Sequence, residues 1–211
     1  GAILTETRNI RASHEELHQC VWSDKYYRAD TAGRELCEMT VGIVGYGAIG
    51  RQVTVLLRAF GCKIQVHDPY AKLSADDLAY GVEMVSLDQL LDHCDIVSLH
   101  PKVTPETQGM MNSEAFSRMK SDALLINTTR GSLCDDDAMI SALKTGGIGG
   151  AVIDTFTTEP LPENHPLLSL PNVTLTSHIA GASVRTVAYA AEQTAEEVRR
   201  YLAGEPPINP Q

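Results

Sequence analysis

Residues 40–50 read Thr-Val-Gly-Ile-Val-Gly-Tyr-Gly-Ala-Ile-Gly, and this stretch decides which fold the sequence predicts. A short β-branched run leads into the pattern Gly-x-Gly-x-x-Gly, and a helical pattern continues from there to residue 60. The glycine pattern alone is weak evidence, but between a strand and a helix it is typical of a turn that binds phosphate groups. In such a turn Gly45 permits the tight bend, Gly47 lets the backbone approach a pyrophosphate, and Gly50 lets the helix pack on the strand.

An acidic residue follows the next predicted strand, at a distance from the glycines that suits a dinucleotide. Backbone N–H groups at the start of the helix, those of Ala48 and Ile49 included, are expected to face the anion. Asp68 comes 23 residues after Gly45, where a carboxylate accepts hydrogen bonds from the adenosine ribose. No arginine follows Asp68, so a ribose 2′-phosphate would meet a carboxylate without a cation. We therefore predict NAD rather than NADP; the alternative, a glycine turn that serves only packing, is disfavoured by the strand, helix and acid together.

The rest of the chain alternates short apolar runs with helical patterns. Strands are predicted over residues 41–44, 63–67, 82–85, 95–99, 123–127, 150–154 and 173–176. Helices are predicted at 48–60, 74–80, 86–93, 113–119, 135–145 and 183–203. Several strands are too apolar to have a face in water, which indicates a parallel sheet covered by helices. We therefore predict an α/β fold with a doubly wound, Rossmann-like parallel sheet in a single domain.

Composition narrows the class of protein. The 211 residues are 43% hydrophobic and 21% charged, as in an ordinary globular chain. The 17 Lys and Arg residues against 27 Asp and Glu residues give a net charge of −10, which opposes nucleic acid, and aromatic residues are only 5%. No run approaches the roughly 20 apolar residues of a membrane span. Five scattered cysteines without a Cys-x-x-Cys pair predict reduced thiols in the cytoplasm and no metal site. We expect neither a nucleic-acid nor a membrane partner.

Three polar segments follow the later predicted strands, at the edge where a doubly wound sheet binds ligands. These segments are 127–131, 154–160 and 177–183. Arg130 can bind a carboxylate through two hydrogen bonds, Glu159 can orient an imidazole, and His178 can exchange a proton near neutral pH. Taken singly, an arginine more often forms a surface ion pair and a histidine a structural hydrogen bond. Their convergence beside a dinucleotide turn favours a site for hydroxy acids.

The ordered set of motifs resembles a known family over nearly the whole chain. The motifs are Gly-Tyr-Gly-Ala-Ile-Gly-Arg at 45–51, Ser-Leu-His at 98–100 with Thr-Pro-Glu-Thr at 104–107, Asn-Thr-Thr-Arg-Gly at 127–131, Asp154 with Glu-Pro-Leu at 159–161, and Ser-His-Ile-Ala-Gly at 177–181. They resemble the D-isomer-specific 2-hydroxyacid dehydrogenases, particularly the phosphoglycerate, glycerate and hydroxypyruvate enzymes. The resemblance implies an NAD-dependent oxidoreductase that acts on the CH–OH group of a small 2-hydroxy acid and reduces the 2-keto acid in reverse.

The resemblance also implies roles for individual residues. Arg130 would bind the substrate carboxylate or carbonyl, Glu159 would pair with the imidazole, and His178 would be the acid and base. The predicted cofactor-binding residues are Gly45, Gly47, Ala48, Ile49, Gly50, Asp68, His100, Pro101, Thr128, Asp154, His178 and Gly181. Two departures stand out: Ser177 replaces the usual proline before the histidine, and Pro101 comes one position early and is followed by Lys102.

The same resemblance implies a domain organisation. Residues 1–38 would form a leading helix and an interdomain or dimer arm, residues 39–204 the NAD-binding domain with the catalytic residues, and residues 205–211 the start of a return to a substrate lobe that this chain lacks. We expect a homodimer, and a fragment that binds NADH but reduces 2-keto acids poorly. Two alternatives are an NAD(H)-sensing scaffold like the transcriptional corepressors of this family, and another NAD enzyme such as a homocysteine-forming hydrolase. The second is disfavoured because Arg130, Glu159 and His178 would not serve it.

Overall fold

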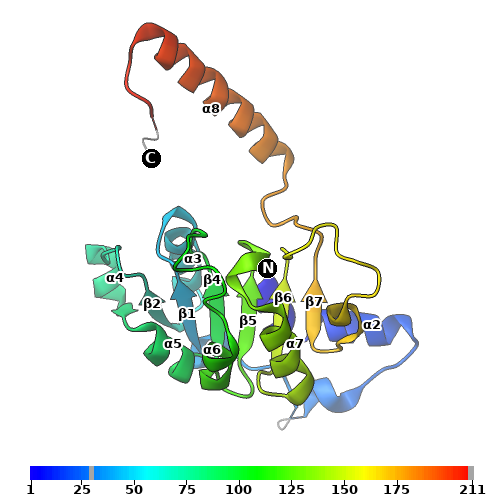
Figure 1. The fold of residues 1–211 in the computed structure, drawn as a ribbon. Coiled ribbons are helices and arrows are strands. Elements are labelled where there is room, and N and C mark those ends of the chain that lie inside the picture. Colours follow the sequence, from blue (N-terminus) through cyan, green and yellow to red (C-terminus); the bar gives the residue numbers. More distant parts are fainter. Residues whose placement is uncertain (29–30, 209–211) are drawn as a thin grey trace. The chain divides into compact units, whose positions relative to one another are not determined.

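The computed structural model describes residues 1–28 and 31–208. The chain divides into two compact units at the boundary between Ser177 and His178. The first unit contains a seven-stranded sheet in the order β3-β2-β1-β4-β5-β6-β7, with every strand parallel to its neighbours (Figure 1). The strand order reverses between β1 and β4, and ligands of such sheets bind where the order reverses. The predicted doubly wound parallel sheet is confirmed.

All seven predicted strands are present, each within one residue of the predicted bounds. They are β1 (Thr40–Val44), β2 (Lys63–His67), β3 (Glu83–Met84), β4 (Ile96–Leu99), β5 (Leu124–Asn127), β6 (Gly150–Ile153) and β7 (Val173–Leu175). Every residue of β4, β5 and β6 is buried. Burial on both faces is the reason that these strands read as continuous apolar runs rather than as alternating patterns.

Helices cover both faces of this sheet, and several of them begin at side-chain caps. They are α3 (Ala48–Arg58), α4 (Ala75–Tyr80), α5 (Leu87–His93), α6 (Ser113–Arg118) and α7 (Asp136–Thr145). Ser74 and Ser86 form capping boxes at the starts of α4 and α5, and Asp135 caps α7. One hydrophobic core lies between the sheet and α5, α6 and α7, and a second lies between the sheet and α3.

The first 38 residues differ in detail from the predicted leading helix. Two helices, α1 (Ala2–Thr7) and α2 (Ile10–His18), are separated at Asn9, whose φ of 55° is left-handed. Asparagine adopts this conformation more readily than most residues, so the chain can break there. Two short 3-10 helices follow, η1 (Asp24–Tyr27) and η2 (Leu36–Glu38). Residues 29 and 30 of the predicted arm lie outside the described residues.

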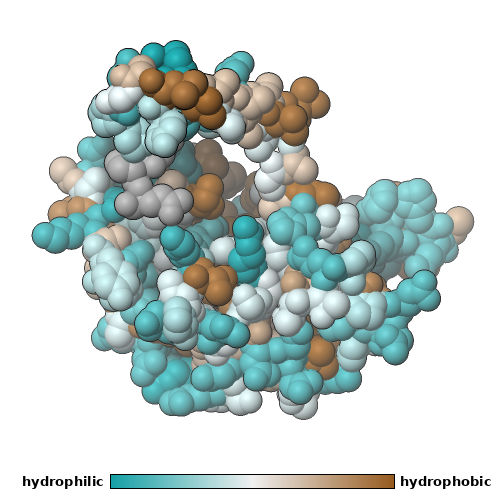
Figure 2. Space-filling view, turned by 45° about the horizontal axis from the view of Figure 1, so that its top comes forward, coloured by the Kyte–Doolittle hydropathy of each residue, from teal (hydrophilic) through white to brown (hydrophobic). Residues whose placement is uncertain are grey.

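The second unit contains one long helix, α8 (Val184–Ala203), which agrees with the prediction for residues 183–203. Ser183 caps its start, and Gly204 ends it with a φ of 70°. No residue of α8 is buried, and hydrophobic side chains are exposed along it (Figure 2). Residues 209–211 of the predicted return segment lie outside the described residues. In the part of the chain that the structure describes, no helix is both long and apolar enough to cross a membrane.

Candidate active site

The turn between β1 and α3 requires glycine at two positions. Gly45 has a φ of 88°, and its N–H donates to the His67 carbonyl at 2.8 Å. A Cβ atom on Gly50 would lie 2.2 Å from the Gly45 carbonyl oxygen, so a side chain there would push α3 away from β1. The predicted reasons for these glycines are therefore confirmed: Gly45 permits the tight bend, and Gly50 lets α3 pack on β1.

The start of α3 is open to a ligand. Gly47 is its N-cap residue and makes no side-chain hydrogen bond to the helix, and no atom lies within 4 Å of the place where its Cβ would be. Ala48 and Ile49 are exposed. Uncapped N–H groups at the start of a helix form a site for an anion. The space at Gly47 is therefore suited to a phosphate group.

Asp68 follows β2 and is held by three backbone N–H groups. One carboxylate oxygen accepts from Tyr46 at 2.7 Å, and the other accepts from Tyr70 at 2.8 Å and from Ala71 at 3.0 Å. Burial by itself raises the pKa of the carboxyl, but these hydrogen bonds outweigh it, so the pKa lies below its ordinary value. Asp68 is therefore a fixed negative charge beside the β1–α3 turn.

The loop after β4 lies against the same turn. A Cβ on Gly45 would lie 2.5 Å from the Pro101 nitrogen. The imidazole Nε2 of His100 is 2.9 Å from the Ser98 hydroxyl, and burial lowers the pKa of His100 to about 4. The structure thus brings His100 and Pro101, two predicted cofactor-binding residues, next to the glycines.

Arg130 is presented by a loop that Asn127 organises. The buried Asn127 amide donates to the Arg130 carbonyl at 2.9 Å and accepts from the Thr129 N–H at 3.1 Å. The Thr129 hydroxyl donates to the Leu99 carbonyl at 2.5 Å, which ties this loop to the end of β4. Arg130 is exposed, and Thr128 is half-buried. The loop backbone is therefore fixed, and the guanidinium of the exposed Arg130 donates to the Thr129 carbonyl at 2.6 Å.

The Arg130 loop and the Glu159 loop are in direct contact. Gly131 begins a 3-10 turn, η3 (Gly131–Leu133), and a Cβ on it would lie 2.1 Å from the Phe156 carbonyl carbon. A Glu159 carboxylate oxygen accepts from the Phe156 N–H at 2.9 Å. One short backbone segment therefore touches Gly131 and positions Glu159, so the structure brings two predicted catalytic residues to neighbouring loops.

A small cavity lies beneath these loops. It has a volume of about 50 Å³, and residues from both loops and from η4 (Pro166–Ser169) line it. The buried Thr155 hydroxyl lines it too and has no hydrogen-bond partner among the described residues. Ligand pockets usually measure roughly 300–1,000 Å³, so this cavity suits an ordered water and not a substrate.

Asp154 is fixed at the end of β6. Its side chain is buried and accepts from the Thr176 hydroxyl at 2.5 Å, and its N–H donates to the Asn127 carbonyl at 3.0 Å. Sequence reasoning missed Thr176, because it lies 22 residues from Asp154 and only the pairing of β6 with β7 brings the two together. It also missed the role of Asn127, although a polar residue at the end of an apolar strand was a signal.

His178 is the first residue of the second unit. It is exposed, and its φ of 56° is left-handed, which is uncommon for a residue other than glycine. Gly181, the last predicted cofactor-binding residue, is also exposed.

The fold and this site define a dinucleotide-binding domain, and comparisons with known proteins assign its family. Residues 1–180 match the family described as "D-isomer specific 2-hydroxyacid dehydrogenase, NAD binding domain". The chain belongs to this family, and its cofactor is a nicotinamide dinucleotide.

Named relatives agree with the family assignment. The chain is 38% identical over 207 residues to a glyoxylate reductase of Thermofilum pendens, covering 98% of this chain and 61% of that enzyme. It is 36% identical over 203 residues to a D-3-phosphoglycerate dehydrogenase of Mycobacterium bovis, covering 96% and 37%. A D-lactate dehydrogenase of Aquifex aeolicus, solved with NAD and lactic acid, superposes with a TM-score of 0.85 at 31% identity, covering 96% and 64%. The chain thus spans less than two thirds of each of these relatives.

Proposed function

We propose that this chain is the cofactor-binding and catalytic portion of an NAD-dependent D-2-hydroxyacid dehydrogenase. The observation that carries the proposal is the contact of Gly131 with the Phe156 backbone. This contact joins the loop of a cationic side chain, Arg130, to the loop of an acidic one, Glu159, at the edge of the sheet that carries the dinucleotide turn. An anionic substrate and a proton-transfer group require these two charges close to a cofactor.

The residues present fit a dinucleotide. The open space at Gly47, which a Cβ would fill, and the uncapped start of α3 suit the pyrophosphate. Asp68 would accept hydrogen bonds from the adenosine ribose, and Asp154 would lie by the nicotinamide. Because Asp68 holds a fixed negative charge, a 2′-phosphate would be repelled there, which supports NAD over NADP.

Three side chains of this chain would have separate roles in the reduction of a 2-keto acid. When bound, the reduced nicotinamide would supply the hydride that reduces the carbonyl carbon. Arg130 would bind the substrate carboxylate and offset the negative charge that develops on the carbonyl oxygen. His178, protonated, would give its proton to that oxygen, so that a hydroxyl group results. Glu159 would orient the imidazole and favour its protonated form. In the reverse direction His178 would take the hydroxyl proton.

The assembly and the compartment are part of the same proposal. Trp22 and Tyr27 in the N-terminal arm are 73% and 74% exposed, and large aromatic side chains at such positions favour contact with a second copy. Cys20 and Cys37 are exposed free cysteines, which favours a reducing compartment such as the cytoplasm. We therefore propose a cytoplasmic homodimer, which size-exclusion chromatography with light scattering would test.

Substitution of two of the three catalytic candidates, Arg130 and His178, tests the function. In the complete protein, we expect Arg130→Ala and His178→Ala each to lower the reduction of 2-keto acids by at least about a thousandfold while NADH still binds. Steady-state assays with glyoxylate and other 2-keto acids would measure turnover, and fluorescence titration would measure NADH binding. Arg118→Ala, which removes a surface arginine paired with Asp88 and Asp92, is the matched control.

Two outcomes would contradict the proposal. Near-normal rates in both variants would remove Arg130 and His178 from the mechanism. A wild-type protein that binds NADH but reduces no 2-keto acid would favour the NAD(H)-sensing scaffold instead.

A further inference from the structure

The loop that follows β4 places Lys102 beside the dinucleotide turn. A Cβ on Gly45 would lie 2.5 Å from the Pro101 nitrogen and 2.6 Å from the His100 carbonyl carbon. The His100 N–H donates to the Val44 carbonyl at 2.7 Å. Because the backbone of residues 100 and 101 lies on the turn, the next residue, Lys102, emerges at its side.

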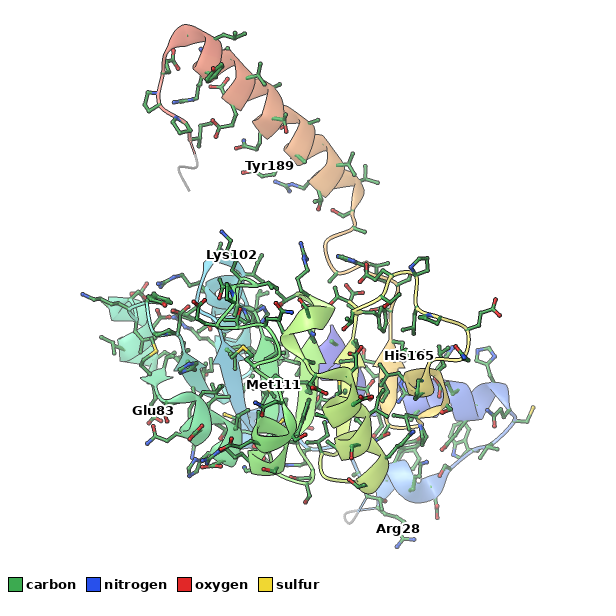
Figure 3. The ribbon with its side chains drawn as sticks, in the orientation of Figure 1. Arg28, Glu83, Lys102, Met111, His165 and Tyr189 are labelled. Atoms are coloured by element: carbon green, nitrogen blue, oxygen red, sulfur yellow. The ribbon has the colours of Figure 1, made fainter. Side chains whose placement is uncertain are left out.

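The backbone of Lys102 is held, whereas its ammonium is available to a ligand. Pro101 restricts the chain before it, and the Lys102 carbonyl accepts from the Thr107 hydroxyl at 2.7 Å. The Lys102 side chain is exposed and points away from the sheet (Figure 3). Across residues 1–28 and 31–208, no hydrogen bond or ion pair engages its ammonium. The flexible stem of a lysine can therefore carry this charge to an anion at the turn.

The turn itself has N–H donors but no cation for a pyrophosphate, which carries two negative charges. Gly47 and the first two residues of α3 are uncharged. Arg51 is the first cation of the helix, but its guanidinium lies 4.5 Å from the centroid of the Tyr46 ring and donates to the Lys72 carbonyl at 3.0 Å. The Arg51 guanidinium is thus already engaged by the Tyr46 ring and by the Lys72 carbonyl.

We propose that the Lys102 ammonium binds the pyrophosphate of the dinucleotide held at residues 45–50. The proposal rests on the dinucleotide site described above and assigns it a further binding residue from another loop. An ammonium-to-phosphate hydrogen bond adds a charged contact to the N–H groups of α3. The affinity for NADH then depends on Lys102 and on ionic strength, with no 2-keto acid present.

Calorimetric titration of NADH into the 211-residue chain tests this assignment. Lys102→Met keeps the length of the side chain and removes its charge, and we expect NADH binding to weaken roughly tenfold, which corresponds to about 1.4 kcal/mol. The affinity of this variant should also depend less on salt. Lys102→Arg should restore most of the affinity. Lys63→Met, which removes an exposed lysine at the opposite edge of the sheet, is the matched control and should bind as wild type does.

Three results of these titrations would contradict the role of Lys102 or the cofactor site on which it rests. Equal affinities of Lys102→Met and wild type for NADH would overturn the proposal. Lys102 would then make no contact with the dinucleotide, and any role that it has would concern the substrate, which is absent from this titration. An equal loss in Lys63→Met would assign the effect to net charge and overturn it as well. If the wild-type chain bound no NADH, the proposed cofactor site itself would fail, which is distinguishable from failure of Lys102 alone.

Discussion

His100 directly follows β4, and its ring packs against the protein. Its Nε2 lies 2.9 Å from the Ser98 hydroxyl, and burial lowers its pKa to about 4. The ring is therefore neutral at neutral pH, although it adjoins the dinucleotide turn through Pro101.

The lowered pKa of His100 makes stability depend on pH. The unfolded chain takes up a proton at this ring near pH 6.5, whereas the folded chain does so only near pH 4. As the pH falls from 6.5 towards 4, the unfolded chain holds more protons, and the free energy of unfolding falls by at most about 1.4 kcal/mol per pH unit. We expect His100→Gln to lose less stability over this range than wild type. Urea denaturation at pH 7, 6 and 5 measures the difference, and parallel curves for the two proteins would contradict it.

Single residues differ in how far the sequence predicts their place in the site. The positions of Gly45 and Asp68 follow from a local pattern, because the glycine turn and the next strand fix both. Thr176 could not be predicted in the same way, since its bond to Asp154 depends on the register of β6 with β7. The contact of Gly131 with the Phe156 backbone is likewise a product of the folded loops.

Strands β4, β5 and β6 were predicted closely because burial on both faces makes each of them a continuous apolar run. The break between α1 and α2 was not predicted, since the apolar spacing continues across Asn9 and only its backbone conformation interrupts the helix. Helix α3 ends at Arg58, two residues before its predicted end. Gly61, with a φ of 72°, follows, so the last residues of the predicted helix already form the turn into β2.

The surroundings of Gly50 and Gly47 predict different effects for substitution of each by alanine. Gly50→Ala places a Cβ 2.2 Å from the Gly45 carbonyl oxygen, so we expect it to lower the free energy of unfolding by about 1–3 kcal/mol. Gly47→Ala meets no atom within 4 Å, so we expect stability to change by less than about 0.5 kcal/mol. Its methyl group would occupy the space for the pyrophosphate, so NADH binding should weaken about tenfold. Urea denaturation and NADH titration measure both effects, and a Gly47→Ala chain that binds NADH as wild type does would contradict the expectation.

The two units differ in how far burial protects their backbones. Residues of β4 and β5 are all buried, and none of α8 is. We expect amide hydrogens of β4 and β5 to exchange only on global unfolding and those of α8 to exchange much faster, since opening α8 exposes little apolar surface. Hydrogen–deuterium exchange with mass spectrometry measures this. Protection of α8 equal to that of β4 would show that another surface covers the helix, and dilution would then tell whether a second copy provides it.

The fit of Gly131 against the Phe156 backbone has a consequence for how this protein can change through evolution or engineering. A larger residue at 131 would displace the segment that positions Glu159, so a mutation chosen to reshape one loop alters the charge presented by the other. The effects of mutations in the two loops should therefore be epistatic, and a change acceptable in one genetic background would be harmful in another. New substrate preferences in this part of the molecule are reached most readily by libraries that vary both loops together.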